Sequence, residues 1–350
     1  MPEIIRVGVV GAGANTRLMH IPGLQRIEGV QVVGVSNRSR ESGERVAREF
    51  SIPNVYSDWR DLVEDPEIDA VCIGTWPSVH CPVTLATLDA GKHVLCEARM
   101  AMNALEAHTM LEASRRNPEL VAQIVPAPFT FKVDRTIQDL IAEGFLGDLL
   151  AINLRLTGSA FVDKSAPLTW RLDRDLSGFN TMMMGIWYEC LMRWTGEAST
   201  VMAMTRVMVP RRKDAEGRLR AVSIPDHVDV LCEMACGAQA HLQFSAVTGL
   251  GPAGEIWLFG SEGTLALNTA MELQGGRRGD TALRPVEVPP EKQGRWRVEE
   301  EFINAIRGIE PVRLTDFATG VKYMEWTEAV IRSAQSGKTI SLPSQQGRLV

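Results

Sequence analysis

The alternation of apolar runs in the first part of the chain is the feature that most constrains its fold. Between Ile4 and about Ile124, short runs rich in β-branched residues are separated by stretches with helical periodicity. Such alternation is typical of parallel strands joined by helices that cover both faces of a sheet. The runs that we expect to form strands are IIRVGVV, VQVVGVS, DAVCIGT, KHVLCE and LVAQIV. We therefore predict an α/β domain with a doubly wound parallel sheet over residues 1–125.

A Pro-Ala-Pro turn at residues 126–128 follows the last of these runs, and the pattern changes after it. A helical segment over 134–143, the strand LLAINLRLT and an apolar helix over about 180–193 precede several strand-like runs joined by short turns. Strands joined in this way favour an open, largely antiparallel sheet. Since 350 residues are enough for two domains, we predict a second α/β domain over 126–350.

Charge and composition exclude several classes of protein. The 37 basic and 43 acidic residues give a net charge of -6, so we expect a small-molecule ligand and no nucleic acid. The chain has no apolar run of about 18 residues, as a membrane helix needs, and its first residues lack an export pattern. We therefore expect a cytoplasmic protein with no membrane contact. The six cysteines lack the spacing of a zinc or redox site, so we expect no metal and interpret them as buried thiols.

A glycine turn follows the first expected strand and precedes a helix. It reads Gly11-Ala12-Gly13-Ala14-Asn15-Thr16, in which the first glycine permits a tight turn and the second lets main-chain amides approach a pyrophosphate. The positive end of the helix dipole adds to the attraction for phosphate. Thr16 replaces the third glycine of the usual pattern, so we expect the helix to lie slightly farther from the strand. The turn predicts a Rossmann-type dinucleotide site.

The residues after the second expected strand indicate which nucleotide is bound. An NAD-selective site usually places Asp or Glu there to bind the ribose 2′-hydroxyl, whereas this chain has Ser36-Asn37-Arg38-Ser39-Arg40. Without a carboxylate to repel a 2′-phosphate, and with Arg38 and Arg40 to bind one, the segment favours NADP over NAD. The alternative is that both arginines are solvated residues at the start of the second helix.

Five segments between residues 75 and 338 form a recognisable combination, and they are Thr75–His80, Ala90–Glu97, Trp170–Arg171, Gly260–Leu265 and Ser336–Lys338. In this order they resemble the Gfo/Idh/MocA family, which is named after glucose-fructose oxidoreductase and inositol dehydrogenase. The resemblance implies a Rossmann domain and a second domain that holds the substrate and forms homodimers or homotetramers through its open sheet. It also implies hydride transfer between NAD(P) and sugars, inositols or related polyols.

The resemblance further implies which residues contact the cofactor. The pyrophosphate is expected to contact Gly11, Gly13, Ala14 and Asn15, and the adenosine ribose to contact Arg38. Thr75, Pro77 and His80 are expected to form the wall beside the cofactor. Glu97 is expected to lie close to the nicotinamide ribose. An alternative role for His80 is that of a residue at a helix start that packs against Trp76.

The catalytic pattern of the family is broken in this chain. The usual Glu-Lys-Pro reads Glu97-Ala98-Arg99, and the usual Asp-x-Gly-x-His-x-x-Asp helix reads Met183-Met184-Gly185-Ile186-Trp187-Tyr188-Glu189-Cys190. The lysine position is therefore an alanine, and the histidine and both aspartates are replaced as well. A positioned base accelerates alcohol oxidation by about 10²–10⁴-fold, and the new side chains cannot act as one. Met183, Trp187 and Cys190 share one helix face and predict a narrower, more apolar substrate pocket.

Four residues are candidates for the missing chemistry. Arg99 can bind a substrate carboxylate or phosphate but cannot act as a base, and Lys132, Lys164 and Tyr188 are candidates for proton transfer. We interpret the chain as an NADP-preferring oxidoreductase that acts on a small carbonyl, imine or sugar-like substrate. Reduction of an activated carbonyl or imine would tolerate the missing lysine better than alcohol oxidation, because water could supply the proton. The alternatives are a non-redox enzyme, such as a lyase or decarboxylase, on the same scaffold, and a nucleotide-binding protein without catalysis.

Overall fold

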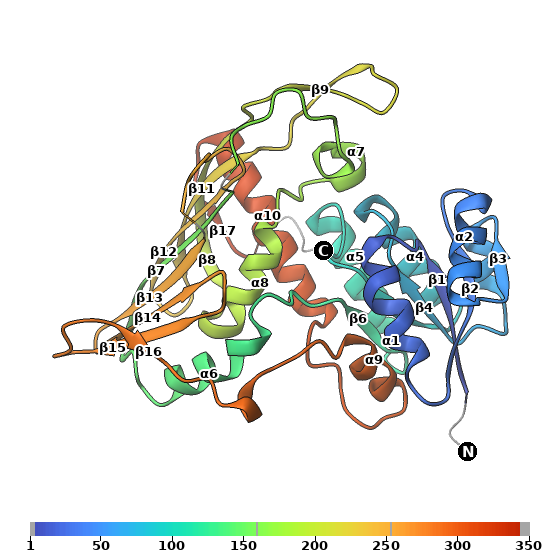
Figure 1. Cartoon of the computed structure of the whole chain (residues 1–350), viewed down its shortest axis with the longest axis horizontal. Coiled ribbons are helices and arrows are strands. Elements are labelled where there is room, and N and C mark those ends of the chain that lie inside the picture. The colour runs from blue at the N-terminus through green and yellow to red at the C-terminus, as the bar shows by residue number, and fades with distance from the viewer. Residues whose placement is uncertain (1–3, 159, 253, 344–350) are drawn as a thin grey trace. The chain divides into compact units, whose positions relative to one another are not determined.

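The structure of the protein is a computed structural model that describes residues 4–158, 160–252 and 254–343. The chain divides into two compact units (Figure 1). The first unit comprises the chain up to Pro126 together with Arg297–Val321. The second unit comprises Ala127–Trp296 and the chain from Lys322 onward.

The first unit is built on a parallel sheet with the strand order β3-β2-β1-β4-β5-β6. Its strands are β1 (Ile5–Val10), β2 (Val30–Ser36), β3 (Asn54–Tyr56), β4 (Ala70–Ile73), β5 (His93–Cys96) and β6 (Ala122–Ile124). The helices between them are a π-helix (Thr16–His20) that continues as α1 (Ile21–Gln25), α2 (Arg40–Phe50), α3 (Trp59–Glu64), α4 (Pro77–Asp89) and α5 (Ala104–Arg116). All residues of β4 and five of the six in β1 are buried, because helices cover both faces. This strand order is that of a Rossmann sheet, which confirms the predicted fold.

The segment Arg297–Val321 belongs to the first unit, whereas the boundary predicted at residue 125 assigns it to the second domain. Thr315 exchanges main-chain hydrogen bonds with Ile124 of β6, with N···O distances of 3.1 and 2.9 Å. Gln123 also donates a side-chain hydrogen bond to the carbonyl of Leu314 at 2.7 Å. Helix α9 (Val298–Ile306) packs against α1. The segment therefore extends the sheet past β6, a long-range pairing that the local pattern does not reveal.

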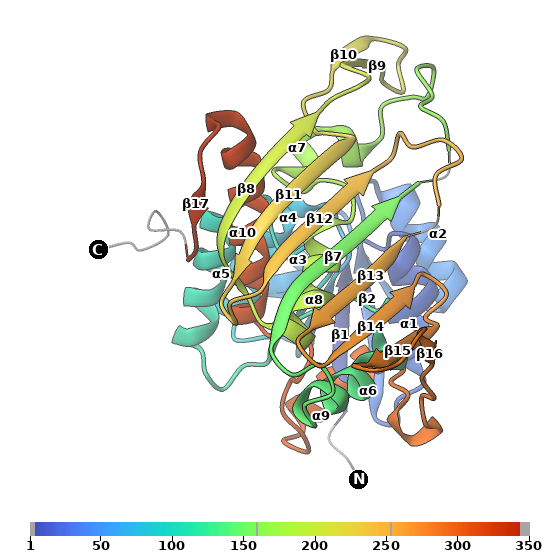
Figure 2. The same ribbon diagram turned by 90° about the vertical axis from the view of Figure 1, so that its left-hand side faces the viewer.

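The second unit is built on a nine-stranded sheet with the order β16-β15-β14-β13-β7-β12-β11-β8-β17 (Figure 2). Its strands are β7 (Leu149–Thr157), β8 (Ala198–Arg206), β11 (His227–Met234), β12 (Gln239–Ser245), β13 (Glu255–Gly260), β14 (Gly263–Asn268), β15 (Leu273–Arg277), β16 (Arg284–Pro285) and β17 (Ile340–Ser341). A separate hairpin pairs β9 (Arg211–Lys213) with β10 (Leu219–Ala221). Strands β7 and β12 are parallel and the other neighbours are antiparallel. The sheet is therefore mixed and largely antiparallel, as predicted.

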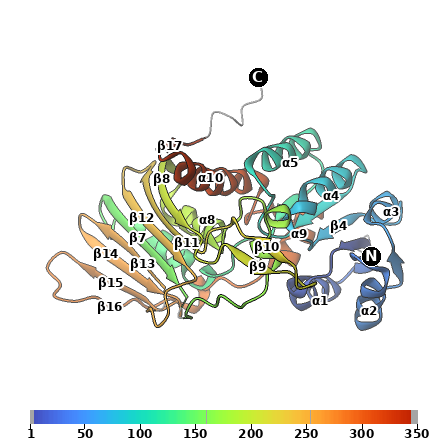
Figure 3. The same cartoon turned by 90° about the horizontal axis from the view of Figure 1, so that it is seen from above.

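Helices cover one face of this sheet (Figure 3). They are α6 (Phe131–Ala142), α8 (Met184–Thr195) and the later part of α10 (Phe317–Ser336), and shorter helical segments occupy Trp170–Leu172, Arg174–Ser177 (α7) and Pro290–Lys292. The ring of Trp326 stacks on Tyr188 with centroids 4.1 Å apart and meets the edge of Phe244 at 6.4 Å. These aromatic side chains form part of the core between helices and sheet.

Five of the six cysteines are buried as expected, but Cys236 is exposed. It lies in the turn between β11 and β12, where strand pairing has ended, so its prediction as a buried thiol is wrong. In the described part of the chain, no helix is both long and apolar enough to cross a membrane.

Candidate functional site

The glycine turn after β1 lies directly against the loop after β4. Gly11 has a φ of +84°, and a Cβ atom there would overlap the Thr75 side chain and lie 2.8 Å from the Thr75 nitrogen. Only glycine therefore fits this position. On the other side of the turn, the Ala12 N–H donates a hydrogen bond to Asn37 Oδ1 at 2.7 Å. The turn is thus held between the carboxyl ends of β2 and β4, where open α/β sheets bind their ligands.

Thr16 replaces the third glycine without loss of the close packing. Its side chain is buried, and its hydroxyl donates to the Gly11 carbonyl at 3.3 Å. Room for it comes from the opposite side, because a Cβ atom on Gly74 would overlap the Thr16 hydroxyl. The glycine required for close approach of helix and strand is therefore at the end of β4. The helix is π-helical from Thr16 to His20, a geometry that is frequent at functional sites.

A cavity of about 540 Å³ opens at this edge of the first unit, within the size range of ligand sites. It is lined by the glycine turn, the segment after β2, the loop between β3 and α3, and the start of α4. The predicted contacts Gly11, Gly13, Arg38 and Thr75 all line it. The glycine turn, the first helical turn and the cavity together form a cradle that fits the pyrophosphate and one nucleoside of a dinucleotide.

Two arginines line the cavity, one in the segment after β2 and one in α3. Arg38 lies over the ring of Trp76 at 5.4 Å, and Arg60 lies over the ring of Trp59 at 4.4 Å. Arg60 is also paired with Asp58, which caps α3. Arg60 is not predicted from the sequence, because the pattern does not reveal the short strand β3, which places the start of α3 beside the cavity.

Arg40, the second arginine predicted to bind a 2′-phosphate, does not itself line the cavity but contacts Ser57, which does. Its guanidinium donates to Glu44 at 3.0 Å and to the Ser57 hydroxyl at 3.2 Å, along the exposed surface of α2. Asn37, which occupies the position of the usual acidic residue, is held between Ala12 and the Ser42 hydroxyl. Its amide oxygen accepts from Ala12 and its amide nitrogen donates to Ser42, so both polar atoms already have partners.

The wall beside the cavity differs from the prediction at two residues. Thr75 lines the cavity, but Pro77 is buried in the first turn of α4. His80 is also buried, with Nδ1 2.9 Å from the carbonyl oxygen of Arg99 and Nε2 3.1 Å from that of Thr75. Burial lowers the pKa of His80. His80 therefore lies between the carbonyl groups of Arg99 and Thr75 and does not line the cavity.

Glu97 lies at the carboxyl end of β5 and is tied to the nucleotide helix. The exposed residues Ala14 and Asn15 begin that helix, and the Asn15 amide donates a hydrogen bond to Glu97 Oε1. His20 Nε2 is 3.0 Å from the same oxygen. Burial acts to raise the pKa of Glu97, but the hydrogen bonds from His20 and Asn15 outweigh it and lower the pKa below its usual value. Glu97 is therefore a fixed carboxylate whose side chain is 14% exposed.

The predicted substrate face of the second unit is not a uniform pocket wall. Met183 precedes the first turn of α8 and is 50% exposed, whereas Trp187 is 5% exposed and Cys190 is fully buried. The ring of Trp187 stacks on Phe129 with centroids 4.8 Å apart. Burial raises the pKa of the Cys190 thiol to about 12. Trp187 and Cys190 therefore pack in the core, and only Met183 offers its surface to a ligand.

The candidates for proton transfer are placed as follows. Tyr188 is buried, its hydroxyl accepts a hydrogen bond from the Ala198 N–H at 2.8 Å, and burial raises its pKa. It belongs to the core, which excludes the predicted catalytic role. Lys132 on α6 and Lys164 in the loop after β7 are both exposed. Arg99, two residues after Glu97 in the first unit, is 5% exposed.

A buried ion network fixes α8. Arg193 donates hydrogen bonds to Asp134 and Glu189, both at 2.9 Å, and to the carbonyl of Ala127 at 2.8 Å. Trp194 donates to the second oxygen of Asp134 at 2.8 Å. These polar side chains hold the helix to the start of the second unit, so they serve its structure.

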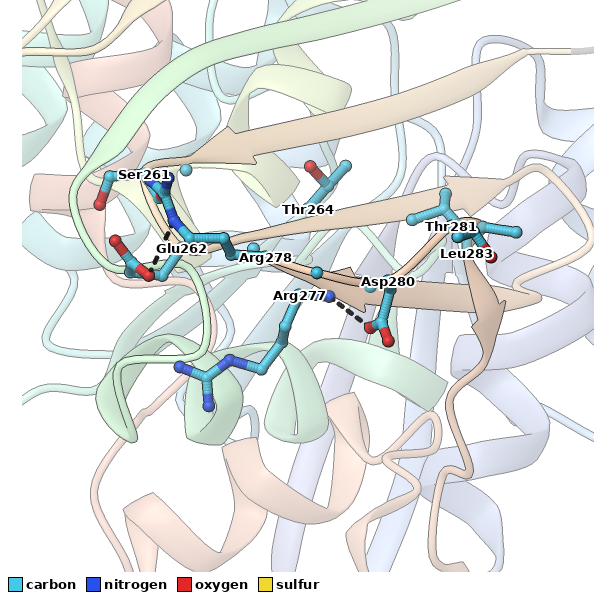
Figure 4. Close-up of a pocket in the computed structure, with 13 residues that line it drawn as sticks. Ser261, Glu262, Thr264, Arg277, Arg278, Asp280, Thr281 and Leu283 are labelled. Atoms are coloured by element: carbon cyan, nitrogen blue, oxygen red, sulfur yellow. Dashed lines mark hydrogen bonds and ion pairs between the residues drawn. The ribbon is translucent and has the colours of Figure 1, made fainter.

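A second hollow, of about 450 Å³, lies at one end of the large sheet (Figure 4). It is formed by the turn between β13 and β14 and the turn after β15. Its carboxylates already have partners within the hollow, since Arg278 contacts Glu262 at 3.3 Å and Asp280 accepts from the main-chain N–H of Arg277 at 2.8 Å. This pairing favours a structural role for the charges over ligand binding.

Comparison with known proteins places these features in context. Residues 5–124 match the oxidoreductase family with an NAD-binding Rossmann fold, and residues 135–266 match the GFO/IDH/MocA C-terminal domain. Levoglucosan dehydrogenase of Pseudarthrobacter phenanthrenivorans is 23% identical over 354 residues, which cover 88% of this chain and 89% of that protein. Trans-1,2-dihydrobenzene-1,2-diol dehydrogenase of Mus musculus is 25% identical over 247 residues, which cover 71% and 68%.

Solved structures show the same fold. A structure of levoglucosan dehydrogenase in complex with NADH and L-sorbose has a TM-score of 0.85 and 23% identity, and covers 97% of this chain and 99% of that one. Aldose-aldose oxidoreductase of Caulobacter crescentus, complexed with glycerol, has a TM-score of 0.78 and 21% identity over 97% of this chain and 100% of that one.

Proposed function

Because this chain belongs to the GFO/IDH/MocA family of NAD-binding oxidoreductases, we propose that it transfers hydride between NADP and a small carbonyl, imine or sugar-like substrate. The observation that carries the proposal is the cavity at the carboxyl ends of β1, β2 and β4, in which a glycine turn and Arg38 lie side by side. A nicotinamide cofactor supplies or accepts the hydride when it is bound. In this chain Gly11, Gly13, Ala14 and Asn15 would hold its pyrophosphate.

The preference for NADP rests on charge at the adenosine end. Asn37 and not an acidic residue directly follows β2, and Arg38 and Arg60 both line the cavity, Arg38 from the segment after β2 and Arg60 from the first turn of α3. A guanidinium binds phosphate in a bidentate manner, so the 2′-phosphate would gain charge-assisted hydrogen bonds. Asp58 offsets part of this charge, but it is already paired with Arg60.

Isothermal titration calorimetry with NADPH and NADH tests this preference. We expect NADPH to bind more tightly, and Arg38→Ala to weaken NADPH binding by about 10–100-fold while it changes NADH binding little, since hydrogen bonds to charged groups contribute about 1.5–3 kcal/mol. Arg45→Ala is the matched control, because Arg45 lies on α2, pairs with the exposed Glu41 and does not line the cavity, and we expect it to leave NADPH affinity within about threefold. Tighter binding of NADH by the unmodified protein would overturn the preference.

A reaction that needs no strong protein base fits the residues at the catalytic positions. Ala98 cannot take a proton from an alcohol, Tyr188 is sealed in the core, and Lys132 and Lys164 are solvated. We propose that a carbonyl or imine is reduced and that water supplies the proton, with the exposed Met183 as a candidate substrate contact. The exposed thioether of Met183 suits a substrate that is less polar than a polyol.

A turnover screen separates this proposal from the other two functions. Carbonyls, imines and sugars are each added to the protein and NADPH, and the change in the absorbance of the reduced nicotinamide is followed. Oxidation of NADPH that depends on one class of substrate supports the oxidoreductase. Substrate conversion without net redox change would support a lyase or decarboxylase, and tight nucleotide binding without any turnover would support a non-catalytic binding protein.

We also propose that the open face of the large sheet joins two copies of this chain. Met202 and Met204 on β8 and Leu231 on β11 are 50%, 79% and 57% exposed, and Leu231 lies opposite Met202 in the strand register. Exposed apolar side chains clustered on one face are typical of protein interfaces. Light scattering coupled to gel filtration is expected to give a homodimer or homotetramer, and Met204→Asp is expected to shift it to smaller species. A monomeric unmodified protein would overturn this proposal.

All six cysteines are free thiols, and we propose a cytoplasmic location because thiols stay reduced in that compartment. Fractionation of the source cells tests it, and recovery in a secreted or periplasmic fraction would refute it.

A further inference from the structure

His20 is buried between two carboxylates in the first unit. Its side chain has no exposed surface, Nδ1 lies 2.5 Å from Glu299 Oε1, and Nε2 lies 3.0 Å from Glu97 Oε1. Glu97 is at the end of β5, whereas Glu299 comes from α9, which is 279 residues away from His20 in the sequence. Three elements of the first unit therefore meet at one imidazole ring, beside the glycine turn.

The local sequence makes this meeting possible. The π-helical turn Thr16–His20 directs His20 toward β5. Gly23 leaves room for the second carboxylate, because a Cβ atom there would lie 2.8 Å from Glu299 Cδ. On the far side, Glu97 Oε2 accepts a hydrogen bond from the Ala98 N–H at 3.0 Å. The Asn15 amide, which begins the nucleotide helix, donates to the same Glu97 oxygen as His20 does.

The arrangement defines the charge of the ring. Each ring nitrogen faces a carboxylate oxygen, and both nitrogens can donate only in the doubly protonated imidazolium. The charged or titratable groups that face this cluster are Glu97 from β5, Glu299 from α9 and the thiol of Cys72 from β4. Burial, with the two carboxylates adding to its effect, raises the pKa of Cys72, so it stays neutral. Burial acts to lower the pKa of His20, but the hydrogen bonds with Glu299 and Glu97 outweigh it and raise the pKa to about 9.

We propose that His20 is a positioning residue which, as an imidazolium shared with Glu299, fixes the Glu97 carboxylate and the Asn15 amide for the nicotinamide half of the bound nucleotide. The inference rests on the proposed function, because it assumes that a pyridine nucleotide occupies the cavity beside the glycine turn. It assigns a part in the cofactor site to Glu299 and thus to the segment Arg297–Val321, which follows the large sheet in the sequence.

The protonation state gives the proposal a specific signature. Since the pKa of His20 is raised to about 9, the positioned state is present below that pH and is lost as the pH rises through it. Loss of the proton leaves Glu97 and Glu299 facing a neutral ring that can donate to only one of them. The nucleotide affinity is therefore expected to fall between about pH 8 and pH 10.

Three variants and one spectroscopic measurement test the proposal. The dissociation constant of NADPH is measured by calorimetry from pH 6.5 to 10 for the unmodified protein and for His20→Gln, Glu299→Gln and His108→Gln. His108, which is half-buried on α5, controls for the loss of a histidine elsewhere in the same unit. In parallel, the ¹⁵N shifts of the His20 ring are followed in the nucleotide-free protein over the same pH range.

We expect His20→Gln to weaken NADPH binding about 10-fold or more at pH 7.5 and to abolish its alkaline loss, because hydrogen bonds to charged groups are removed. Glu299→Gln, which leaves His20 with one carboxylate, is expected to move the loss to lower pH. His108→Gln is expected to follow the unmodified protein. Should His20→Gln fail to fold, Glu299→Gln and the ring shifts of the unmodified protein still decide the question.

The outcomes separate this inference from the proposed function. If the unmodified protein binds neither NADPH nor NADH, the proposed function fails, and the ring shifts then still show whether His20 is an imidazolium at pH 8. If NADPH binds with an affinity that is independent of pH between 8 and 10 and unaffected in Glu299→Gln, the positioning role is wrong and the proposed function stands. A neutral His20 ring at pH 7 would overturn the inference by itself.

Discussion

Replacement of Gly11 by alanine isolates what the close approach of the glycine turn contributes. Alanine at a φ of +84° costs about 1–2 kcal/mol, because the left-handed region brings Cβ close to the main chain. At Gly11 the Cβ atom would also overlap the Thr75 side chain and lie 2.8 Å from the Thr75 nitrogen, and such overpacking costs about 1–3 kcal/mol. Gly11→Ala is therefore expected to destabilise the protein by about 2–5 kcal/mol.

Gly91 provides the matched control in the same unit. Its φ is +72°, and a Cβ atom there would have no neighbour within 4 Å, so Gly91→Ala carries only the conformational cost of about 1–2 kcal/mol. Gly91 also precedes β5 at the amino end of the sheet, away from the cavity.

Urea unfolding and calorimetry with NADPH are the assays for the pair. We expect Gly11→Ala to weaken NADPH binding by about 100-fold or more, because Thr75 must move into the cavity to relieve the overlap. We expect Gly91→Ala to weaken NADPH binding by less than about threefold. Equal losses of stability and affinity in the two variants would refute the reasoning.

Three further outcomes follow from the structure. Arg193→Met leaves two buried carboxylates without their partner, so we expect it to lower the free energy of unfolding, measured in urea, by about 3–5 kcal/mol. Arg45→Met removes one partner of an exposed ion pair and is expected to change that free energy by less than about 1 kcal/mol. Tyr188→Phe leaves the Ala198 N–H unpaired and is expected to cost about 1–3 kcal/mol without altering the pH–rate profile; an altered profile would make Tyr188 a proton donor again. The pKa of His20 is raised from 6.5 to about 9, so the protonated ring stabilises the folded protein by about 3 kcal/mol. This contribution is complete below pH 6.5 and is lost as the pH rises through 9. Urea midpoints at pH 7 and 10 should therefore differ more in the unmodified protein than in His20→Gln.

The predicted fold rested on patterns that each strand carries locally. The parallel strands of the first unit are apolar on both faces, and β7 alternates buried Ile152 and Leu154 with exposed Asn153, so each type of sheet has its own signature. The return of Arg297–Val321 to the first unit has no such signature. It depends on the pairing of Thr315 with Ile124, which are 191 positions apart, and pairing over that distance cannot be read from periodicity.

The candidate site was predictable where it depends on the main chain. Gly11 is needed for the path of the chain itself, a Cβ atom on Gly13 would lie 3.2 Å from the Gly74 carbonyl oxygen, and the spacing of the two glycines marks the turn in the sequence. Gly74 was not recognised, because its function arises only when the Thr16 hydroxyl lies opposite it. Trp187 and Cys190 were assigned to the pocket from helical spacing, but spacing does not show which face of α8 the core covers.

The burial of three ionisable groups around His20 costs free energy of desolvation. Two carboxylates and one imidazolium are removed from water, and the desolvation of such groups often exceeds their mutual attraction, so apolar replacements of similar size are frequently as stable or more so. Stability alone therefore does not explain why His20, Glu97 and Glu299 meet in the interior of the first unit. The cluster joins the helix of the glycine turn to the end of β5, and the Asn15 amide links it to the first residues of that helix. The buried charge is thus placed where a change in protonation alters Glu97 and Asn15, as the proposed positioning role requires.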